Sequence, residues 1–181
     1  MYDQIIRGNE KCVVTFIDFA AAFDSVSHKY IDKALEKAGA SRKTRAIFRA
    51  IYRAAQGAAR IRSVDGKVYL SKVFDIKRGV IQGDIISPIL FILALDQLVQ
   101  QVDTSGKGIS VGTIKEIRVL GYADDAAMTE RSTGQMTVRL SEFADAALNK
   151  ADMKVKLSKT FSQIVQQQEA VDSITAAEII K

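Results

Sequence analysis

The stretch that most constrains the fold is Gly121-Tyr-Ala-Asp-Asp-Ala126, where two adjacent carboxylates stand between two apolar runs. Residues 115–120 mix charged and apolar side chains, and residues 126–128 are apolar. This pattern predicts a β-hairpin with Asp124 and Asp125 at its tip. An isolated Asp-Asp pair is most often a solvated turn, since turns favour aspartate. Neighbouring acids also repel one another unless a cation lies between them, which makes the pair a candidate divalent-metal site.

Composition limits which class of protein and which kind of metal site this chain can form. The chain has 181 residues, 48% of them hydrophobic, as expected for one globular domain with a sizeable core. No apolar run is long enough to span a membrane and no secretory signal is evident, so we expect a soluble, intracellular protein. The single cysteine, Cys12, and the single histidine, His28, do not form a zinc cluster. Oxygen ligands remain, and these favour Mg²⁺ or Mn²⁺.

Basic side chains are concentrated between residues 37 and 62, where no acid occurs, in a chain of net charge +5. Arg45, Arg49 and Arg53 recur at helical spacing, so they share one helix face. Such an arginine stripe fits the backbone of a nucleic acid. The alternative is an ordinary solvated helix face. Because solvated faces usually interleave acids with bases, we favour nucleic-acid binding.

Residues 11–19 form a β-branched and aromatic run that predicts a buried central strand, with Asp18 at its end. A carboxylate in such a run is costly to bury unless it is paired, although at a strand end it can also reach solvent. Periodicity and capping residues predict helices over residues 27–38, 41–56, 88–100 and 133–151, a hairpin with a two-residue turn at 64–67, and an edge strand at 153–157 with outward lysines.

The apolar spacing also predicts which helix faces are buried. The expected inner residues are Ile47, Ala50, Ile51 and Ala54 in the second helix and Met136, Leu140, Phe143, Ala147 and Leu148 in the last helix. The helix that begins at Pro88 is apolar almost all round and should be the most buried. Residues 77–84 form a glycine-punctuated loop before it. Two glycines there would let another molecule approach the backbone closely, although a plain connector is the default reading.

The order of these elements predicts an α+β fold, an antiparallel sheet with helices packed on one face. In that arrangement Asp18 would lie on a strand next to the one that carries Asp124 and Asp125. Three carboxylates brought together would hold two divalent ions, which activate the attacking oxygen and stabilise the leaving oxygen in phosphoryl transfer.

Four segments resemble the palm motifs of reverse transcriptases, specifically those of the LINE-type, non-LTR retrotransposon group. They are Phe16–His28, Gly79–Phe91, the Tyr-x-Asp-Asp box Tyr122–Asp125, and Lys159–Thr160, in family order. The resemblance covers about residues 10–162. It implies a polymerase-type palm over residues 1–165 that includes part of the fingers at about 27–79, followed by a C-terminal tail at 166–181.

By this resemblance, Asp18, Asp124 and Asp125 would be the catalytic carboxylates that bind two Mg²⁺ or Mn²⁺ ions. The backbone of Phe19 would help to hold the metal on the triphosphate. These expectations come from the family motifs.

The same resemblance gives roles to four further residues. Phe23, by default a core aromatic, would be a steric gate that favours dNTP over rNTP. Gln82 and Gly83 would lie against the incoming nucleotide and template. Lys159 would place a proton or positive charge near the departing pyrophosphate.

The chain departs from the family pattern at positions that concern nucleotide and template contacts. Ala21 stands where the family often has Lys, Ile81 where it often has Arg, Ile85 where Pro is common and Lys156 where Asn is usual. None of these changes removes a metal ligand. The family's N-terminal fingers motifs and its thumb are expected beyond the two ends of this sequence, in a larger polyprotein.

The sequence therefore predicts a fragment of an RNA-directed DNA polymerase that acts on an RNA template, a DNA primer and dNTP. A catalytically inactive remnant that serves as a nucleic-acid-binding or assembly module is the main alternative. A metal-dependent nuclease that uses the same acids is a weaker one.

Overall fold

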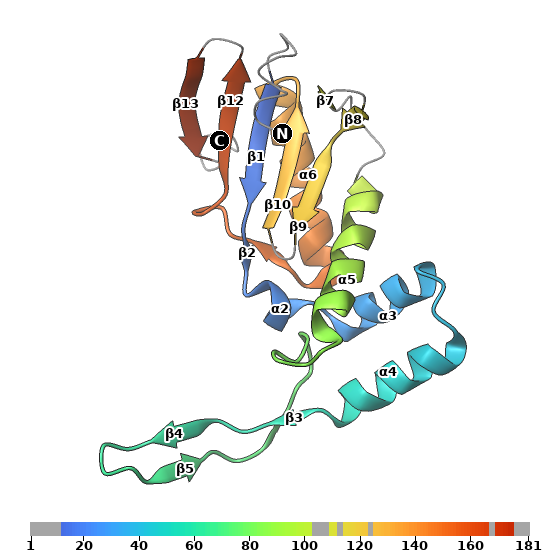
Figure 1. The fold of residues 1–181 in the computed structure, drawn as a ribbon, viewed down its shortest axis with the longest axis vertical. Coiled ribbons are helices and arrows are strands. Elements are labelled where there is room, and N and C mark those ends of the chain that lie inside the picture. The colour runs from blue at the N-terminus through green and yellow to red at the C-terminus, as the bar shows by residue number, and fades with distance from the viewer. Residues whose placement is uncertain (1–11, 103–108, 112–113, 123–124, 167–168, 176–181) are drawn as a thin grey trace.

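A five-stranded antiparallel sheet forms one end of the molecule, and the first strand of the chain lies at its centre (Figure 1). The computed structural model describes residues 12–102, 109–111, 114–122, 125–166 and 169–175. The sheet has the strand order β13-β12-β1-β10-β9, made of Glu169–Thr175, Phe161–Gln166, Cys12–Ile17, Asp125–Glu130 and Val119–Tyr122. The central position of β1 confirms the strand predicted from its apolar run.

The two faces of β1 differ in what they contact. Val13 and Ile17 belong to the hydrophobic core on one face. Phe16 points to the other face and stacks on Phe161 of β12, with ring centroids 4.9 Å apart. Successive side chains of a strand alternate between faces, so a run that is apolar throughout is expected where both faces are covered.

Helices α5 (Ser87–Val102) and α6 (Thr133–Ala151) cover the core face of the sheet (Figure 1). Helix α6 contacts β1 and β10, and α5 contacts β9 and α6. The α+β arrangement with helices on one face is therefore confirmed. The predicted inner face of α6 is also confirmed, except that Leu148 is 49% exposed.

A buried ion pair joins the sheet to α6. Arg139 Nε lies 2.6 Å from Glu130 Oε1, and both residues are almost inaccessible to solvent. Burial raises the pKa of Glu130, and the charges of Arg139 and Arg118 oppose that shift. The sequence gives no sign of this pair, because neither Glu130 nor Arg139 stands inside a long apolar run, where burial would be expected.

Three helices lie below the sheet: α2 (Ala22–Ser25), α3 (His28–Lys37) and α4 (Arg42–Ala54). Ser41 caps α4 as predicted, and Ser27 caps α3, each through a side-chain oxygen that accepts a backbone N–H bond. Gly39 follows α3 with a φ of 84°, the left-handed conformation that commonly ends helices.

The predicted inner face of α4 is wrong. Phe48 and Tyr52 are buried, whereas Ile47 and Ile51 are 53% and 46% exposed. Helix α4 instead turns its arginines toward acids on α3, as described below. These ion pairs, together with the burial of two aromatic rings, set the rotation of the helix about its axis.

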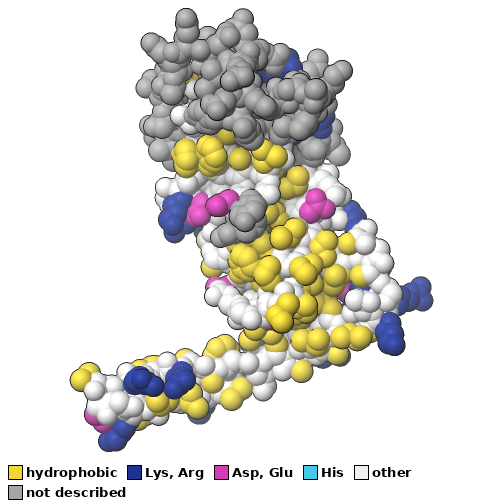
Figure 2. Space-filling view, viewed as in Figure 1, with side chains coloured by type: hydrophobic (Ala, Val, Ile, Leu, Met, Phe, Trp, Pro, Cys, Tyr) yellow, Lys and Arg dark blue, Asp and Glu magenta, His cyan; other side chains and the backbone are white. Residues whose placement is uncertain are grey.

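Helix α5 is apolar almost all round, but it is buried on one side only. Phe91 and Leu98 are fully buried, but Ile89 and Ile92 are 58% and 51% exposed. Figure 2 shows hydrophobic side chains gathered on the front of the molecule below the acids. The sheet and the neighbouring helices pack against one side of α5 and leave its other side exposed.

Residues 55–76 form an extended arm that projects from the end of α4 (Figure 1). Strand β3 (Gln56–Gly57) pairs with β6 (Phe74–Asp75), and β4 (Arg60–Arg62) pairs with β5 (Val68–Leu70). The predicted hairpin is confirmed, but its turn is longer by one residue. The Ser63 N–H donates to the Lys67 carbonyl, and the Gly66 N–H donates to the Ser63 carbonyl. Gly66 has a φ of 83°, as in a three-residue loop.

Two short pairs complete the topology. Strand β2 (Phe19–Ala20) pairs with β11 (Lys154–Val155), and β7 (Ile109–Val111) pairs with β8 (Ile114–Ile117). In β11 the lysine is exposed and the valine is buried, as the edge-strand pattern predicted. None of the helices within the described ranges has the length and apolar character needed to cross a membrane.

Gly79 provides a test of how the loop before α5 is held. Its φ is 81°, and a Cβ atom there would lie 2.6 Å from the carbonyl oxygen of Asp24. We expect Gly79→Ala to lower the free energy of unfolding by about 3 kcal/mol or more, since strain and a backbone clash add.

Gly39→Ala is the matched control, because its φ is 84° but no atom lies within 4 Å of the new Cβ. It should cost only about 1 kcal/mol in urea denaturation. Equal losses in the two variants would show that the contact with Asp24 is not what requires glycine.

Candidate active site

The end of β1 and the start of β10 bring two predicted acids together. Ile17 pairs with Ala126 as the last rung of the β1–β10 ladder, so Asp18 and Asp125 are the next residues on neighbouring strands. Ile17 and Phe19 both pack in the helix-side core, which directs Asp18 to the other face. Opposed residues of antiparallel strands share a face. Asp18 is half-buried and Asp125 is exposed.

The predicted hairpin around the second acid is confirmed. Strands β9 and β10 pair antiparallel, with Asp125 opposite Tyr122. Asp124 lies outside the described residues, between these two positions in the sequence. The structure therefore brings together two of the three predicted carboxylates and describes no position for the third.

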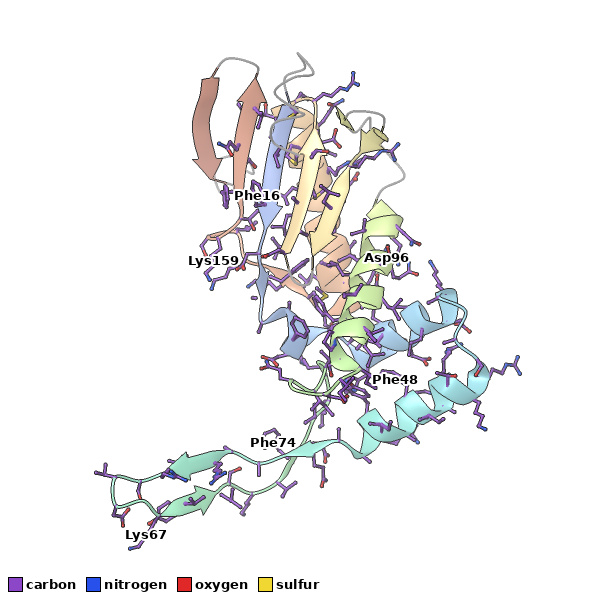
Figure 3. All side chains as sticks on the ribbon, in the orientation of Figure 1. Phe16, Phe48, Lys67, Phe74, Asp96 and Lys159 are labelled. Atoms are coloured by element: carbon purple, nitrogen blue, oxygen red, sulfur yellow. The ribbon has the colours of Figure 1, made fainter. Side chains whose placement is uncertain are left out.

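The backbone of Asp18 is held by the turn that follows β11. Its carbonyl accepts the Lys156 N–H at 2.7 Å, and its N–H donates to Thr160 Oγ1 at 3.4 Å. Thr160 is buried, and its hydroxyl also donates to the Lys156 carbonyl at 3.1 Å. Lys159 is exposed on this turn, beside the end of β1 (Figure 3). Thr160 belongs to the fourth motif with Lys159, and that membership is the sequence signal for it, although no role was predicted for its side chain.

The ring and the backbone of Phe19 lie in different surroundings. Its ring lies in the core, 6.0 Å from that of Phe143. The bond between Asp18 and Lys156 makes that rung a hydrogen-bonded one, and rungs alternate in an antiparallel ladder. The next rung, Phe19 opposite Val155, therefore directs the N–H and C=O of Phe19 away from β11.

Phe23 stands at the junction between the first motif and α5. It is half-buried and stacks on Phe91, with ring centroids 4.4 Å apart and an interplanar angle of 18°. Ala21 precedes it with φ 49° and ψ 54°, a left-handed conformation that is strained for alanine. Strained backbone of this kind is concentrated at functional sites.

The glycine-punctuated loop folds back onto the same segment. Gly79 N–H donates to the Val26 carbonyl at 2.8 Å, and Val80 N–H donates to the Phe23 carbonyl at 2.7 Å. Gln82 Nε2 donates to Asp24 Oδ1 at 2.8 Å. Asp24 is thus a further polar residue of the site that the sequence analysis quoted within a motif without giving it a role.

Gly83 is in open space. Its φ is 87°, and no atom lies within 4 Å of the position that a Cβ would take. Ser87 Oγ donates to the Ile81 carbonyl at 2.6 Å, which holds the loop against the start of α5. Phe23, Gln82 and Gly83 are therefore near neighbours, brought together by backbone bonds between two segments distant in sequence.

The arginine stripe of α4 is opposed by acids, contrary to the expectation from its sequence window. Arg45 Nη2 lies 2.8 Å from Asp32 Oδ2, and Arg45 also pairs with Glu36; Arg49 Nη1 lies 3.0 Å from Asp32 Oδ1. Both acids come from α3 and precede residue 37, so they lie outside the acid-free stretch 37–62. The arginines hold the pKa of Asp32 below its usual value.

Arg53 forms none of the ion pairs found among the described residues, but it lies near them. It lines a hollow of about 300 Å³ whose other lining residues are His28, Lys29, Asp32, Phe48, Arg49 and Tyr52. A nucleic-acid contact through Arg45, Arg49 and Arg53 stays a prediction. Arg45 and Arg49 already form ion pairs with Asp32 within the protein.

Comparison with known proteins identifies the family. The sequence profile of the family described as "Reverse transcriptase (RNA-dependent DNA polymerase)" matches residues 3–172. The chain belongs to this family. It is 32% identical over 133 residues, 73% of this chain, to the retrovirus-related Pol polyprotein from type-1 retrotransposable element R2 of Popillia japonica. It is 30% identical over 164 residues to the type-2 R2DM polyprotein of Drosophila melanogaster. These relatives confirm the LINE-type group.

Solved structures support the fold. Apo telomerase from Candida tropicalis matches 99% of this reverse transcriptase chain with a TM-score of 0.61 at 11% identity, covering 35% of that protein. Telomerase from Candida albicans, solved in complex with a fragment of telomeric RNA, matches with a TM-score of 0.54 at 13% identity. The chain spans only 18% and 15% of the two R2 polyproteins.

Removing the Thr160 hydroxyl should loosen the end of β1. We expect Thr160→Val to lower the free energy of unfolding by about 1–3 kcal/mol, because the Asp18 N–H loses its buried acceptor. Amide hydrogen exchange at Asp18 should become faster. Thr160→Ser keeps the hydroxyl and is the control; protection of Asp18 that is equally low in both variants would contradict the proposed role of this bond.

The Asp32 pairs predict a pH dependence of stability. Because the folded pKa of Asp32 is below its usual value of 3.8, its contribution to stability is present above that value and is lost as the pH falls through the folded pKa. We expect Asp32→Asn to lower the free energy of unfolding at pH 7 by about 1 kcal/mol. The difference from the unaltered protein should shrink below pH 4 in urea denaturation. A difference that stays constant from pH 7 to pH 2.5 would show that the charge on Asp32 is not its source.

Proposed function

We propose that this chain carries the palm of an RNA-directed DNA polymerase, which transfers a nucleotide from dNTP to the 3′-hydroxyl of a primer on an RNA template. The observation that supports this most is the opposed placement of Asp18 and Asp125 at the ends of two neighbouring strands, in a chain of the reverse transcriptase family. Residues 1–165 would form the palm with part of the fingers, at about 27–79, and residues 166–181 a tail.

The residues present fit a pair of divalent cations. Among the residues that the structure describes, no Lys or Arg side chain forms an ion pair with Asp18 or Asp125. Opposed carboxylates without a cation repel one another, and their oxygens are the ligands that Mg²⁺ and Mn²⁺ prefer. Asp18, Asp124, Asp125 and the backbone oxygen of Phe19 would hold two Mg²⁺ ions. Such ions supply charge stabilisation at the attacking and leaving oxygens of phosphoryl transfer.

The nucleotide would bind beside Phe23, Gln82 and Gly83. Phe91 supports one side of the Phe23 ring, so the ring has little freedom to move away from a sugar that approaches it. A fixed ring would exclude a 2′-hydroxyl and favour dNTP. The bond to Asp24 holds the Gln82 amide next to this position, and Gly83 leaves room for the nucleotide and template.

Lys159 would act on the departing pyrophosphate. It is exposed on the turn whose backbone and Thr160 hydroxyl bind the Asp18 backbone, so its position is linked to that of the acid. A cation there would stabilise negative charge as it develops on the leaving group. Thr160 would be a positioning residue, because it acts through Asp18.

The remainder of a longer polyprotein would complete the enzyme. The exposed isoleucines of α4 and α5, Ile47, Ile51, Ile89 and Ile92, form apolar surface that a thumb, fingers or another domain would cover. RNA in one telomerase neighbour supports an RNA template here as well.

Primer extension tests the proposed acids. In the chain completed with its upstream and downstream regions, Asp18→Asn and Asp125→Asn should each lower Mg²⁺-dependent extension on an RNA template by about 100-fold or more, because metal stabilisation of the transition state provides several kcal/mol. RNA affinity should change little.

Asp145→Asn is the matched control, since Asp145 is an exposed acid on α6, in the layer behind the sheet. It should extend primers at the normal rate. Normal extension by Asp18→Asn would refute the proposal, and RNA binding without extension by the completed parent protein would favour the nucleic-acid-binding remnant instead.

A further inference from the structure

Helix α3 turns its acids toward α4 and lines a cleft with its lysines, of which Lys29 also lines the hollow that contains Asp32. Its acids, Asp32 and Glu36, face α4 and pair with Arg45 and Arg49. Its lysines Lys29, Lys33 and Lys37 recur every four residues, which places them in one row along the helix. In an isolated helix each acid would sit one turn from a lysine and neutralise it. Because α4 takes both acids, the row of lysines keeps its positive charge.

This row lines a cleft of about 600 Å³ between α3, α5 and the C-terminal end of α6. Lys150 of α6 adds a fourth lysine to the lining, and Asp152 is its one acid. Within the described ranges no ion pair involves any of the four lysines. The cleft therefore carries an excess of positive charge that the protein itself does not balance.

Amide side chains form the rest of the polar lining. Gln97 is only 4% exposed, and its Nε2 finds no hydrogen-bond partner among the described residues. A buried donor without an acceptor is unfavourable, and an apolar residue at this position of α5 would avoid that cost. Gln101 donates to the hydroxyl of Tyr30 at 3.2 Å, and Asn149 is exposed at the rim. The unpaired Gln97 Nε2 and the unpaired lysines together indicate a ligand that is rich in anionic oxygen.

The cleft lies away from the proposed catalytic acids. It is built from α3, α5 and α6, and α5 and α6 cover the core face of the sheet (Figure 1). The strand register directs Asp18 and Asp125 to the other face. A ligand in the cleft therefore would not occupy the position expected for the nucleotide.

We propose that this cleft binds the sugar-phosphate backbone of a nucleic-acid strand, as a second contact separate from the acidic site. Lys, Ser, Asn, Gln and Tyr are the side chains that contact phosphate and sugar oxygens in nucleic-acid complexes, and the lining consists of these types apart from Asp152. A protein partner would need an apolar anchor at the centre of its interface, and no exposed large hydrophobic side chain lines the cleft.

Binding of a labelled single-stranded RNA oligonucleotide to the full chain, measured over a range of KCl concentrations without metal or dNTP, tests this site. The triple variant Lys29→Gln/Lys33→Gln/Lys37→Gln should raise the Kd at least tenfold. Its salt slope should fall by about two, since each lost phosphate contact to a single strand removes roughly 0.7. The three lysines are exposed, so far-UV circular dichroism should be unchanged.

The control is Lys43→Gln/Lys72→Gln/Lys154→Gln, which removes the same charge from three exposed lysines, on α4, between β5 and β6, and on β11. It should weaken binding by less than threefold. Equal weakening in the two triple variants would overturn the proposal, because net charge alone would then account for binding.

Two further measurements separate the remaining outcomes. Gln97→Leu removes the buried donor without a change of charge, and it should weaken RNA binding while the protein stays as stable as the parent or becomes more stable. A polyglutamate peptide of equal charge that competes as well as the RNA would overturn the proposal in favour of an acidic protein partner. The assay needs no catalysis, so it is independent of the polymerase proposal.

Discussion

The antiparallel register between β1 and β10 is the interaction on which the rest of the structure depends. Ile17 opposite Ala126 places the next residues of both strands, Asp18 and Asp125, at adjacent positions on the same face. Because side chains alternate with a period of two, a slip by one residue would turn the core residues outward and the acids inward. The packing of Val13, Ile17 and Met128 against the helices therefore also specifies the position of the acids.

Apart from the bond between Gln82 and Asp24, two loops bind the candidate site through its backbone groups. The turn after β11 binds the peptide groups of Asp18, and the glycine-punctuated loop binds those of Phe23 and Val26. Backbone bonds of this kind restrain position whatever the neighbouring side chains are. Among the motif departures, Lys156 takes part in these contacts only through its backbone N–H and carbonyl, which any residue at that position would provide.

The charges on α3 and α4 show why local sequence was an incomplete guide to electrostatics. The window from residue 37 to residue 62 contains no acid, so its arginines looked unpaired. The fold brings Asp32 and Glu36 from the preceding helix against them, and the lysines of α3 are left as the unbalanced group. For the same reason the buried face of α4 was misassigned: periodicity identified a helix with an apolar side, but two aromatic rings and the ion pairs decided which side was covered.

The sequence by itself determined the elements whose signals are local. Capping serines marked α3 and α4, glycines marked the turns, the apolar run marked the central strand, and the ordered motifs marked the family and the acids. The tertiary structure alone decided which faces are buried, that α5 is exposed along Ile89 and Ile92, that Thr160 holds Asp18, and that Glu130 pairs with Arg139 in the core. Those outcomes depend on contacts between residues far apart in the chain. Such contacts form, and contribute to stability, only when the helices and strands pack together.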